Sequence, residues 1–511
     1  MMMPPNPNSY VETNKDGSVT PPLFLRENWN RGGLVEVTEE GYTVSKILGN
    51  YMYMEFDPTT STMVSSGLVA GKDDPKTAAS KTSGMMLTTN EHMQLPIINE
   101  ESSLFSETEN DINEEVPNGL SAKWVGTKKN LMIPLKFANH VNRKVPTIEE
   151  LSILMNNEGP HALCPTGSVR DVFLASSYNQ LDLNTTVAPW VTLPNTEAYY
   201  ANGESGTNAQ KAHEMIRDGL NALQATGFNF DEFDTDNDGR IDAIGFLHSG
   251  YGMEFGGTSA DGAEPKDRIR SHKWTLFSLP GKKWTSTSGK LVVNYHISPS
   301  LWGISGSDIG RIATPAHEAA HFFGMPDLYD TDGSGGGGIG SFCLMANSWG
   351  FDGSQYNPPH LSAWGKVQMG WVNPKVISTS GTYSARKSCE FTDIFLIGNG
   401  TANFDIGEYL LIENRQPCKF DAKIPGPGLA IFHIDDSADF TTEGYPGQTG
   451  WPLNGNHYRV ALLQADGEYH LEKGYNYGDA NDFTQTLKLT RAESFVTQGS
   501  PSAASVYLET P

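Results

Sequence analysis

The sequence predicts an α+β protein in which helices back a twisted mixed sheet, with a polar region before it and a β-rich region after it. Three observations support this fold class: apolar strand-like runs from about residue 130, one amphipathic segment at residues 209–225, and short strands between Gly- and Pro-rich turns in the last third. A chain of 511 residues is long enough for roughly two to four domains. We expect three parts, residues 1–120, 121–375 and 376–511, and the third could be continuous with the second.

The composition is typical of a globular protein that works in water. Hydrophobic residues make up 38% of the chain, and no apolar run reaches the about 18 residues that a membrane-spanning helix needs. The formal net charge is −24 and the sequence pI is near 4.9. Binding to nucleic acid or anionic lipid is therefore unfavourable, because both partners would be negative. We expect neither a nucleic acid partner nor a transmembrane segment.

The N-terminal part, residues 1–120, is rich in polar and turn-forming residues, with strand-like runs only at residues 34–44 and 47–56. No signal peptide is visible, because the first residues have neither a basic start nor an apolar stretch. Residues 67–119 are polar, lack periodicity and include an acidic cluster at residues 100–115. This predicts an exposed connector that proteases can reach. The acidic cluster is read first as a solvated loop and second as a regulatory or cleavable segment.

The middle part begins with residues 131–137, an apolar run typical of a buried strand, in which Pro134 favours an edge position. Residues 209–225 place their apolar side chains on one helical face, and Gly227 suits the end of that helix. Residues 241–248 then form a compact apolar strand.

The C-terminal part predicts mainly strands, such as residues 409–413 and 429–434. The chain has four cysteines, too scattered for a zinc knuckle and compatible with one or two disulfides. They are Cys164, Cys343, Cys389 and Cys418.

Residues 317–321 read His-Glu-Ala-Ala-His, and this segment carries the main chemistry. On a helix, positions i and i+4 lie on one face, so His317 and His321 can present their imidazoles to one metal ion with Glu318 beside it. A zinc ion with three protein ligands keeps one position for water, lowers the pKa of that water towards about 7 and polarises a scissile carbonyl. Glu318 would accept the water's proton. The pentapeptide alone occurs by chance in roughly one or two per cent of chains this long, so its context decides.

The residues that follow extend the motif to HExxHxxGxxD. Gly324 can adopt a positive φ, and the resulting turn would fold the chain beneath the metal and bring in Asp327 as a third ligand. The alternative for Asp327 is a loop cap. Further on, Met345 stands in a turn-like setting and could form an apolar floor under the ligands, although a methionine taken alone is more often ordinary core.

A second metal-binding pattern lies at residues 234–242, which read DTDNDGRID. Alternate oxygens of such a loop can converge on a hard cation, for which calcium fits best, and Gly239 would supply the tight turn. The expected ligands are the side chains of Asp234, Asp236, Asp238 and Asp242 and the backbone carbonyl of Arg240. The loop is not an EF-hand, because Gly245 stands where that motif needs a glutamate. The alternative is an acidic solvated turn.

A further cation site could involve four residues of a Gly-rich stretch, but their spacing satisfies no rule. These residues are Asp466, Asn476, Asp479 and Asp482.

Taken together, these segments resemble the immune inhibitor A-like metallopeptidases, which belong to the metzincin group of zinc proteases. The resemblance rests on HEAAHFFGMPDLYD at residues 317–330, on Gly-Ile-Gly-Ser at residues 338–341 leading to Met345, and on Ser-Trp-Gly at residues 348–350. It spans about residues 125–485. Shorter blocks in the family's order lie at residues 166–171, 271–274, 370–372, 413–416 and 431–435.

The resemblance implies a metzincin-like catalytic domain with His317, His321 and Asp327 as zinc ligands, Glu318 as general base and Met345 as the Met-turn. It implies an endopeptidase that acts on proteins or peptides. Residues 38–44 and 51–55 look like the family's pro-segment, which would make the protein a zymogen. The family is normally exported, so we expect secretion, although no signal peptide is visible. Relatives often continue into further β domains beyond the point where this chain stops.

The sequence is also compatible with two other functions. One is a metal-binding surface or structural protein of the same fold with little turnover, against which Glu318 argues. The other is a thermolysin-like enzyme whose third ligand is a glutamate on a later helix. This second interpretation is disfavoured because the segment from Gly324 to Asp327 already offers both a turn and a ligand.

Overall fold

The structure is a computed structural model, and it describes most of the chain from residue 124 to residue 490 and several strands outside that range. The described residues are 18, 23–28, 33–38, 43–47, 50–57, 62–74, 124–276, 283–329, 337–379, 381–399, 404, 406–438, 440, 444–445, 457–490 and 505–509.

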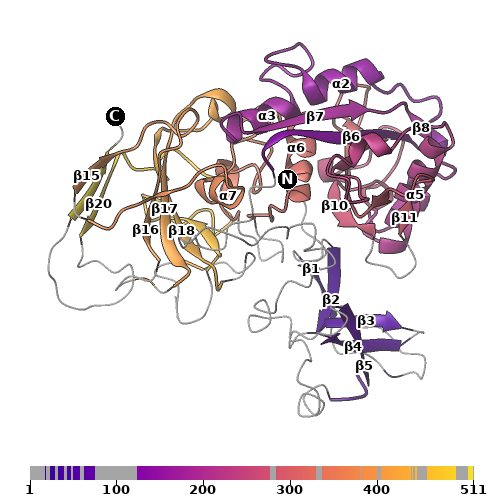
Figure 1. The fold of residues 1–511 in the computed structure, drawn as a ribbon, viewed down its shortest axis with the longest axis horizontal. Helices are drawn as coiled ribbons and strands as arrows, with labels where there is room; N and C mark the ends of the chain where they lie inside the picture. Colours follow the sequence, from indigo (N-terminus) through magenta and orange to yellow (C-terminus); the bar gives the residue numbers. More distant parts are fainter. Residues whose placement is uncertain are drawn as a thin grey trace.

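The N-terminal strands form an antiparallel sheet of their own, in which each strand pairs with the next along the chain (Figure 1). The strands are β1 (Leu23–Asn28), β2 (Gly33–Thr38), β3 (Thr43–Ile47), β4 (Asn50–Asp57) and β5 (Thr62–Val69). The expected strand at residues 34–44 is thus two strands, β2 and β3, whereas residues 47–56 largely coincide with β4. Most of the predicted connector, including its acidic cluster, lies outside the described residues.

A mixed sheet forms the centre of the molecule, in the order β10-β13-β9-β6-β7, with the short β8 also paired to β6. Its pairs are parallel except for the edge strand β10, which is antiparallel to β13. The strands are β6 (Gly126–Lys136), β7 (Leu181–Val187), β8 (Val191–Thr192), β9 (Ile244–Tyr251), β10 (His272–Thr275) and β13 (Asn294–Leu301). The predicted strands at residues 131–137 and 241–248 are confirmed as β6 and β9, and so is the mixed α+β class.

The expected edge position of Pro134 is wrong, because β6 lies inside the sheet between β9 and the β7–β8 segment. The pairing with β7 ends at Met132, and the pairing with β8 begins only at Leu135. Pro134 therefore falls in the break between two partners on that side. A proline is tolerated there because its missing N–H interrupts no ladder hydrogen bond.

Helices cover both faces of this sheet, and the side chains of β6 alternate between two cores. Met132 packs on one face with α2 (Ile148–Asn156), α3 (Val169–Ser176) and α6 (Ala313–Phe322). Leu131 and Ile133 pack on the other face with α5.

The predicted helix at residues 209–225 is confirmed as α5 (Ala209–Gln224). The Asn208 side chain accepts a hydrogen bond from Lys211 N at its start, and Gly227 has φ of 82° just beyond its end. Two short helices are α4 (Glu197–Ala201) and α7 (Ala363–Gln368), and β11 (Trp284–Thr285) pairs with β12 (Leu291–Val292).

The C-terminal part forms a second mixed sheet, in the order β14-β16-β17-β18-β19, and a three-stranded sheet, β15-β21-β20 (Figure 1). The predicted strands at residues 409–413 and 429–434 are confirmed within β17 and β18. A disulfide joins Cys389 to Cys418, while Cys164 and Cys343 are free and buried. The strands are β14 (Lys375–Val376), β15 (Gly381–Ser384), β16 (Ile394–Gly398), β17 (Glu408–Arg415), β18 (Gly428–Asp435), β19 (Val460–Leu462), β20 (Thr486–Thr490) and β21 (Ser505–Glu509).

One hydrophobic core runs across residue 375. It contains Ala316 of α6, Trp364 of α7, and Leu411 and Phe432 of the C-terminal sheet. The opposite face of that sheet has a small core of its own, which includes Leu410. Accordingly, α6 and α7 lie between the central sheet and the C-terminal sheet in Figure 1. Among the described residues, no helix has both the length and the apolar character needed to cross a membrane.

Candidate active site and metal centres

The histidine motif lies on α6, which follows β13 and packs against β13 and the edge strand β10. Alanines favour the helix, and Pro315 stands in its first turn, where the missing N–H costs no helical hydrogen bond. His317 and Glu318 are buried with exposed fractions of 1% and 3%. Buried polar groups of this kind need partners, and those partners identify the site.

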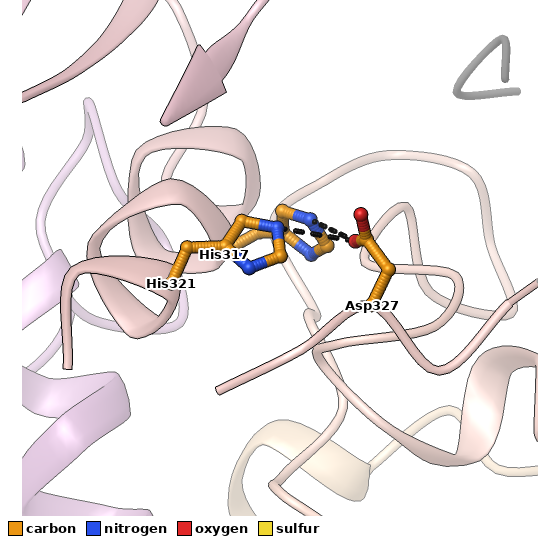
Figure 2. A group of neighbouring side chains, drawn as sticks. All are labelled: His317, His321 and Asp327. Carbon is orange, nitrogen blue, oxygen red and sulfur yellow. Dashed lines mark ion pairs between the residues drawn. The ribbon is translucent and has the colours of Figure 1, made fainter. Parts of the chain in front are cut away.

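Two imidazoles and one carboxylate converge on a single point (Figure 2). The Nε2 atoms of His317 and His321 each lie 3.1 Å from Oδ1 of Asp327. Two ligands of a tetrahedral zinc ion, each about 2.0–2.1 Å from it, are about 3.3 Å apart, so this spacing fits such an ion. The three expected ligands are therefore brought together by the fold.

Backbone carbonyls orient both histidines. Nδ1 of His317 lies 2.8 Å from the carbonyl oxygen of Leu344, and Nδ1 of His321 lies 2.7 Å from that of Met325. A carbonyl can only accept, so each Nδ1 carries the proton and donates it. In this tautomer each neutral imidazole would present the lone pair of Nε2 to Asp327 Oδ1. A metal cation between the three atoms would satisfy all of them, so the arrangement suits a metal site.

The turn expected at Gly324 is present, with φ of 96°. The amides of Gly324 and Met325 donate to the carbonyls of His321 and Ala320, which closes the end of the helix and reverses the chain. Asp327 is consequently 3% exposed and points at the histidines, as a metal ligand requires and a solvent-facing loop cap does not.

Glu318 follows His317 on α6 and interacts electrostatically with Asp327, and its Oε2 has no hydrogen-bond partner among the described residues. Burial is the main reason that the pKa of Glu318 is raised to about 8, and the negative charge of Asp327 acts in the same direction. A carboxyl group that is buried, unpaired and next to a metal site can accept a proton from water. A bound cation would stabilise its ionised form.

Met345 is fully buried in the segment that holds the site together. Its carbonyl accepts a hydrogen bond from Leu328 N, next to Asp327, while its own N–H donates to Cys343 Sγ. The preceding residue, Leu344, accepts from His317. The turn around Met345 therefore touches the support of one histidine and of the carboxylate. Sequence reasoning missed the carbonyls of Leu344 and Met325, because a backbone carbonyl has no side-chain signature.

The acidic loop brings only part of its expected ligand set together. Carboxylate oxygens of Asp234, Asp236 and Asp242 lie within 4.8 Å of one another. The Oδ1 of Asp234 is buried and has no hydrogen-bond partner among the described residues. Asp238 is outside this group, and its Oδ1 accepts from Arg240 N at 2.8 Å. Gly239 has φ of 87° and donates its N–H to Asp234 Oδ2, so the expected tight turn is present.

A cation outside the loop contacts one of its aspartates, since Lys290 Nζ lies 2.6 Å from Asp234 Oδ2. Burial raises the pKa of Asp242, and the neighbouring Asp236 and Asp234 raise it further. A cavity of about 70 Å³ borders the loop and reaches Phe322, the last residue of α6.

The third cluster joins Asp466, Asp479 and Asp482, whose carboxylate oxygens also lie within 4.8 Å of one another. Asn476 contacts this group by donating from Nδ2 to Asp479 Oδ2 at 3.1 Å. The four residues named from the sequence thus lie together, although their spacing obeys no motif.

A mixed sheet backed by a buried His-Glu-x-x-His helix, with two imidazoles and a carboxylate around one point, is typical of the catalytic domain of a metallopeptidase. Residues 164–372 match the family model described as immune inhibitor A peptidase M6, catalytic domain. This match confirms the resemblance to the immune inhibitor A-like metallopeptidases that the sequence showed.

Curated relatives agree with this assignment. The chain is 31% identical over 176 residues to immune inhibitor A of Bacillus thuringiensis subsp. alesti, an alignment that covers 30% of this chain and 24% of the relative. It is 26% identical over 234 residues to the pre-pro-metalloprotease PrtV of Vibrio cholerae serotype O1 (strain M66-2), covering 41% of this chain and 25% of the relative. The matched part thus spans about a quarter of the length of these relatives.

Proposed function

We propose that this protein is a zinc-dependent endopeptidase of metzincin type that hydrolyses peptide bonds in proteins. The observation that carries the proposal is the convergence of His317 Nε2, His321 Nε2 and Asp327 Oδ1 on one point beside the unpaired carboxyl of Glu318. His317, His321 and Asp327 would hold the metal, and Glu318 would act as general base. Met345 would be the Met-turn beneath them.

When bound, zinc would supply an activated water and a Lewis acid that polarises the scissile carbonyl. The protein's own groups do the rest. Leu344 and Met325 keep the imidazoles in the tautomer that offers Nε2 to the metal. Glu318 would accept the proton from the attacking water and hand it to the leaving amine, as a buried carboxylate without another hydrogen-bond partner on Oε2 can do.

The substrate would bind along β10, the edge strand next to α6. An extended peptide can pair with an open strand edge through main-chain hydrogen bonds, which are permissive about sequence. The expected substrates are therefore proteins and peptides.

Assay and metal content test this function together. The full chain should bind one equivalent of zinc at this site, hydrolyse an unfolded protein substrate, lose that activity with a chelator and regain it with zinc. His317→Ala should lose both the zinc and the activity. Zinc binding without hydrolysis, both by the full chain and after a cut within residues 67–119 with removal of the N-terminal fragment, would instead favour the metal-binding structural protein of the same fold.

We also propose that the N-terminal region keeps the enzyme latent. β2 overlaps the pro-segment-like residues 38–44 at its end and lies next to β10 (Figure 1). A segment in that position would obstruct the strand edge on which we expect substrates to bind. The name of the PrtV relative describes a pre-pro form, which agrees with a zymogen.

Limited proteolysis tests latency. The initial rate per zinc-loaded molecule should rise after a cut in the connector at residues 67–119, provided that the N-terminal fragment is then separated. The cut site is mapped by mass spectrometry. Equal rates before cleavage and after removal of the fragment would reject an inhibitory pro-segment.

For the acidic loop we propose a structural calcium ion held by Asp234, Asp236, Asp238, the carbonyl of Arg240 and Asp242. The buried Oδ1 of Asp234 has no hydrogen-bond partner among the described residues, which supports an ion there because a buried carboxylate oxygen needs a donor or a cation. Asp238 would have to turn from Arg240 N towards the ion.

We further propose that the protein acts outside the cell. The Cys389–Cys418 disulfide is typical of proteins that fold in an oxidising compartment, and the PrtV relative carries a pre-pro name. Quantitative thiol labelling of the protein as isolated from its source should find Cys389 and Cys418 oxidised.

A further inference from the structure

A group of fully buried charged side chains joins the C-terminal sheet to the catalytic domain. Glu413 and Arg415 on β17 each have an exposed fraction of 0%, and their partners Lys366 of α7 and Asp421 are 1% and 2% exposed. Lys366 Nζ lies 2.8 Å from Glu413 Oε2, and Arg415 Nη2 lies 2.7 Å from Asp421 Oδ1. Burying charged side chains costs desolvation free energy. Their presence here therefore points to a role other than stabilising the fold.

Arg415 connects this group to the turn around Met345. Its Nη1 donates to the backbone carbonyl of Phe342 at 2.9 Å, three residues before Met345. Arg415 also donates to Glu413 Oε1 at 3.1 Å and to Asp421 Oδ1, and this same Oδ1 of Asp421 accepts from His360 N at 3.1 Å. The carbonyl of His360 in turn accepts from Leu344 N. Arg415 thus holds the segment from Phe342 to Leu344 at both ends: it contacts Phe342 O directly, and it reaches Leu344 N through Asp421 and His360.

That segment is the one that supports the candidate metal ligands. Leu344 O accepts from Nδ1 of His317, and Met345 O accepts from Leu328 N beside Asp327. Continuous hydrogen bonds therefore run from Arg415 on β17 to the imidazole of His317 on α6. The two residues are far apart in the sequence, yet every intermediate in this path is buried.

We propose that Arg415 is a positioning residue of the metal site, and that the metal-binding unit therefore extends past residue 375 to include β17. The proposal rests on the proposed zinc site. Arg415 suits this role because its planar guanidinium donates in two fixed directions, to Phe342 O and to Asp421. A shift of the Phe342–Leu344 segment would rotate the His317 ring, and metal affinity depends on such outer partners of a ligand.

The test separates positioning from ordinary stability by comparing two substitutions on the same strand. Arg415→Met removes the donors and keeps an apolar side chain of similar reach. Leu410→Ala creates a cavity on the opposite face of β17, in the small core that does not touch the Met345 turn. Three quantities are measured on the full chain: the melting temperature, the rate of zinc loss to a chelator well below that temperature, and the visible spectrum of the cobalt(II)-substituted protein.

Arg415→Met should lose zinc faster by about tenfold or more and should change the cobalt spectrum, because the His317 ring loses its orientation. Leu410→Ala should lower the melting temperature yet leave zinc loss and the cobalt spectrum as in the wild type. Arg415→Lys, which keeps the charge but cannot donate in both directions at once, should fall between. Equal zinc loss from Arg415→Met and Leu410→Ala at the same folded fraction would overturn the proposal.

Two controls keep the result interpretable. If Arg415→Met does not fold, Arg415→Lys and Asp421→Asn take its place against Leu410→Ala, with the same expected difference. His317→Ala tests the zinc site itself. If His317→Ala retains as much zinc as the wild type, the proposed zinc site fails and this proposal fails with it. If zinc retention depends on His317 but not on Arg415, only the positioning role of Arg415 is contradicted and the zinc site stands.

Discussion

Two of the candidate metal sites of this protein, the acidic loop and the site on α6, are built in opposite ways. The acidic loop would take its ligands from residues 234–242, and Asp236 and Asp238 are exposed. The site on α6 would take two ligands from a helix and one from the turn after it, and all three are buried or nearly so. A hard cation such as calcium accepts flexible oxygens at varied angles, whereas zinc requires few ligands at fixed angles.

The supports of the two sites differ for the same reason. In the loop, backbone amides within residues 234–242 bind its carboxylates, as Gly239 N does with Asp234 and Arg240 N with Asp238. At α6, Met325 orients His321 from nearby in the chain, but His317 is oriented by Leu344, whose segment is held by Arg415. The loop is thus supported mainly by its own backbone, with Lys290 as an outside contact, whereas the site on α6 depends on distant parts of the chain. The predictions below test this difference.

The largest effect is expected from Glu318→Gln. Hydrolysis should fall by at least about 100-fold, because the amide cannot accept the water's proton, while bound zinc should remain. The matched control is Glu197→Gln, since Glu197 is equally buried at 3% exposed and burial likewise raises its pKa to about 8. Activity per bound zinc is the measurement. Normal turnover in Glu318→Gln would remove the general base assignment.

Asp327→Ala should weaken zinc binding by more than about tenfold, because it would remove a direct ligand. Losing a residue that only hydrogen-bonds to a ligand already lowers metal affinity by about that factor. Activity should fall with the zinc content. The stabilisation by calcium should not change, because the acidic loop is supported locally. Zinc retention under a chelator and melting with and without calcium are measured on the same preparation. Unchanged zinc retention would assign the third ligand to another residue.

Calcium removal should lower the melting temperature while zinc stays bound. The aspartates of the loop repel one another without an ion, and calcium at about 100 times its dissociation constant would stabilise the fold by about 2.7 kcal/mol. Asp236→Asn is the variant in which this effect should shrink. Melting that is independent of calcium, with no ion bound, would leave the loop as a solvated acidic turn.

The smallest effect concerns pH. In the calcium-free protein, burial and the neighbouring aspartates raise the pKa of Asp242 above its unfolded value. Its contribution to stability is then fully present below about pH 4 and is lost as pH rises through the folded pKa. A bound calcium ion removes that loss because it favours the ionised carboxylates. The gap in melting temperature with and without calcium should therefore widen from pH 4 to pH 7.

Scanning calorimetry of calcium-depleted protein, with and without added calcium and with zinc throughout, measures this gap. Asp242→Asn supplies the control, in which the gap should depend less on pH. A gap that stays constant over the whole range would show that Asp242 does not govern the response.

Sequence alone determined the features that depend on local spacing. The i, i+4 histidines share a face of α6, Gly324 makes the turn that delivers Asp327, and the apolar run at residues 131–137 predicts a buried strand. These follow from helix and strand geometry, which needs only neighbours in the chain. The acidic loop was predictable in the same way, although the structure groups three of its aspartates and leaves Asp238 bonded to Arg240 N.

Tertiary structure decided what depends on distant partners. The edge position predicted for Pro134 was wrong because β6 changes its partner from β7 to β8 at this point, which makes an interior proline acceptable. The residues next to Pro134 in the sequence do not reveal this break. The carbonyl of Leu344 became the support of His317 only through packing, and Arg415 reached Phe342 only because β17 lies against the same core as α6. A ligand's identity is written in its side chain, but its orientation comes from backbone atoms that every residue shares, and only the folded chain determines which of these atoms lies nearby.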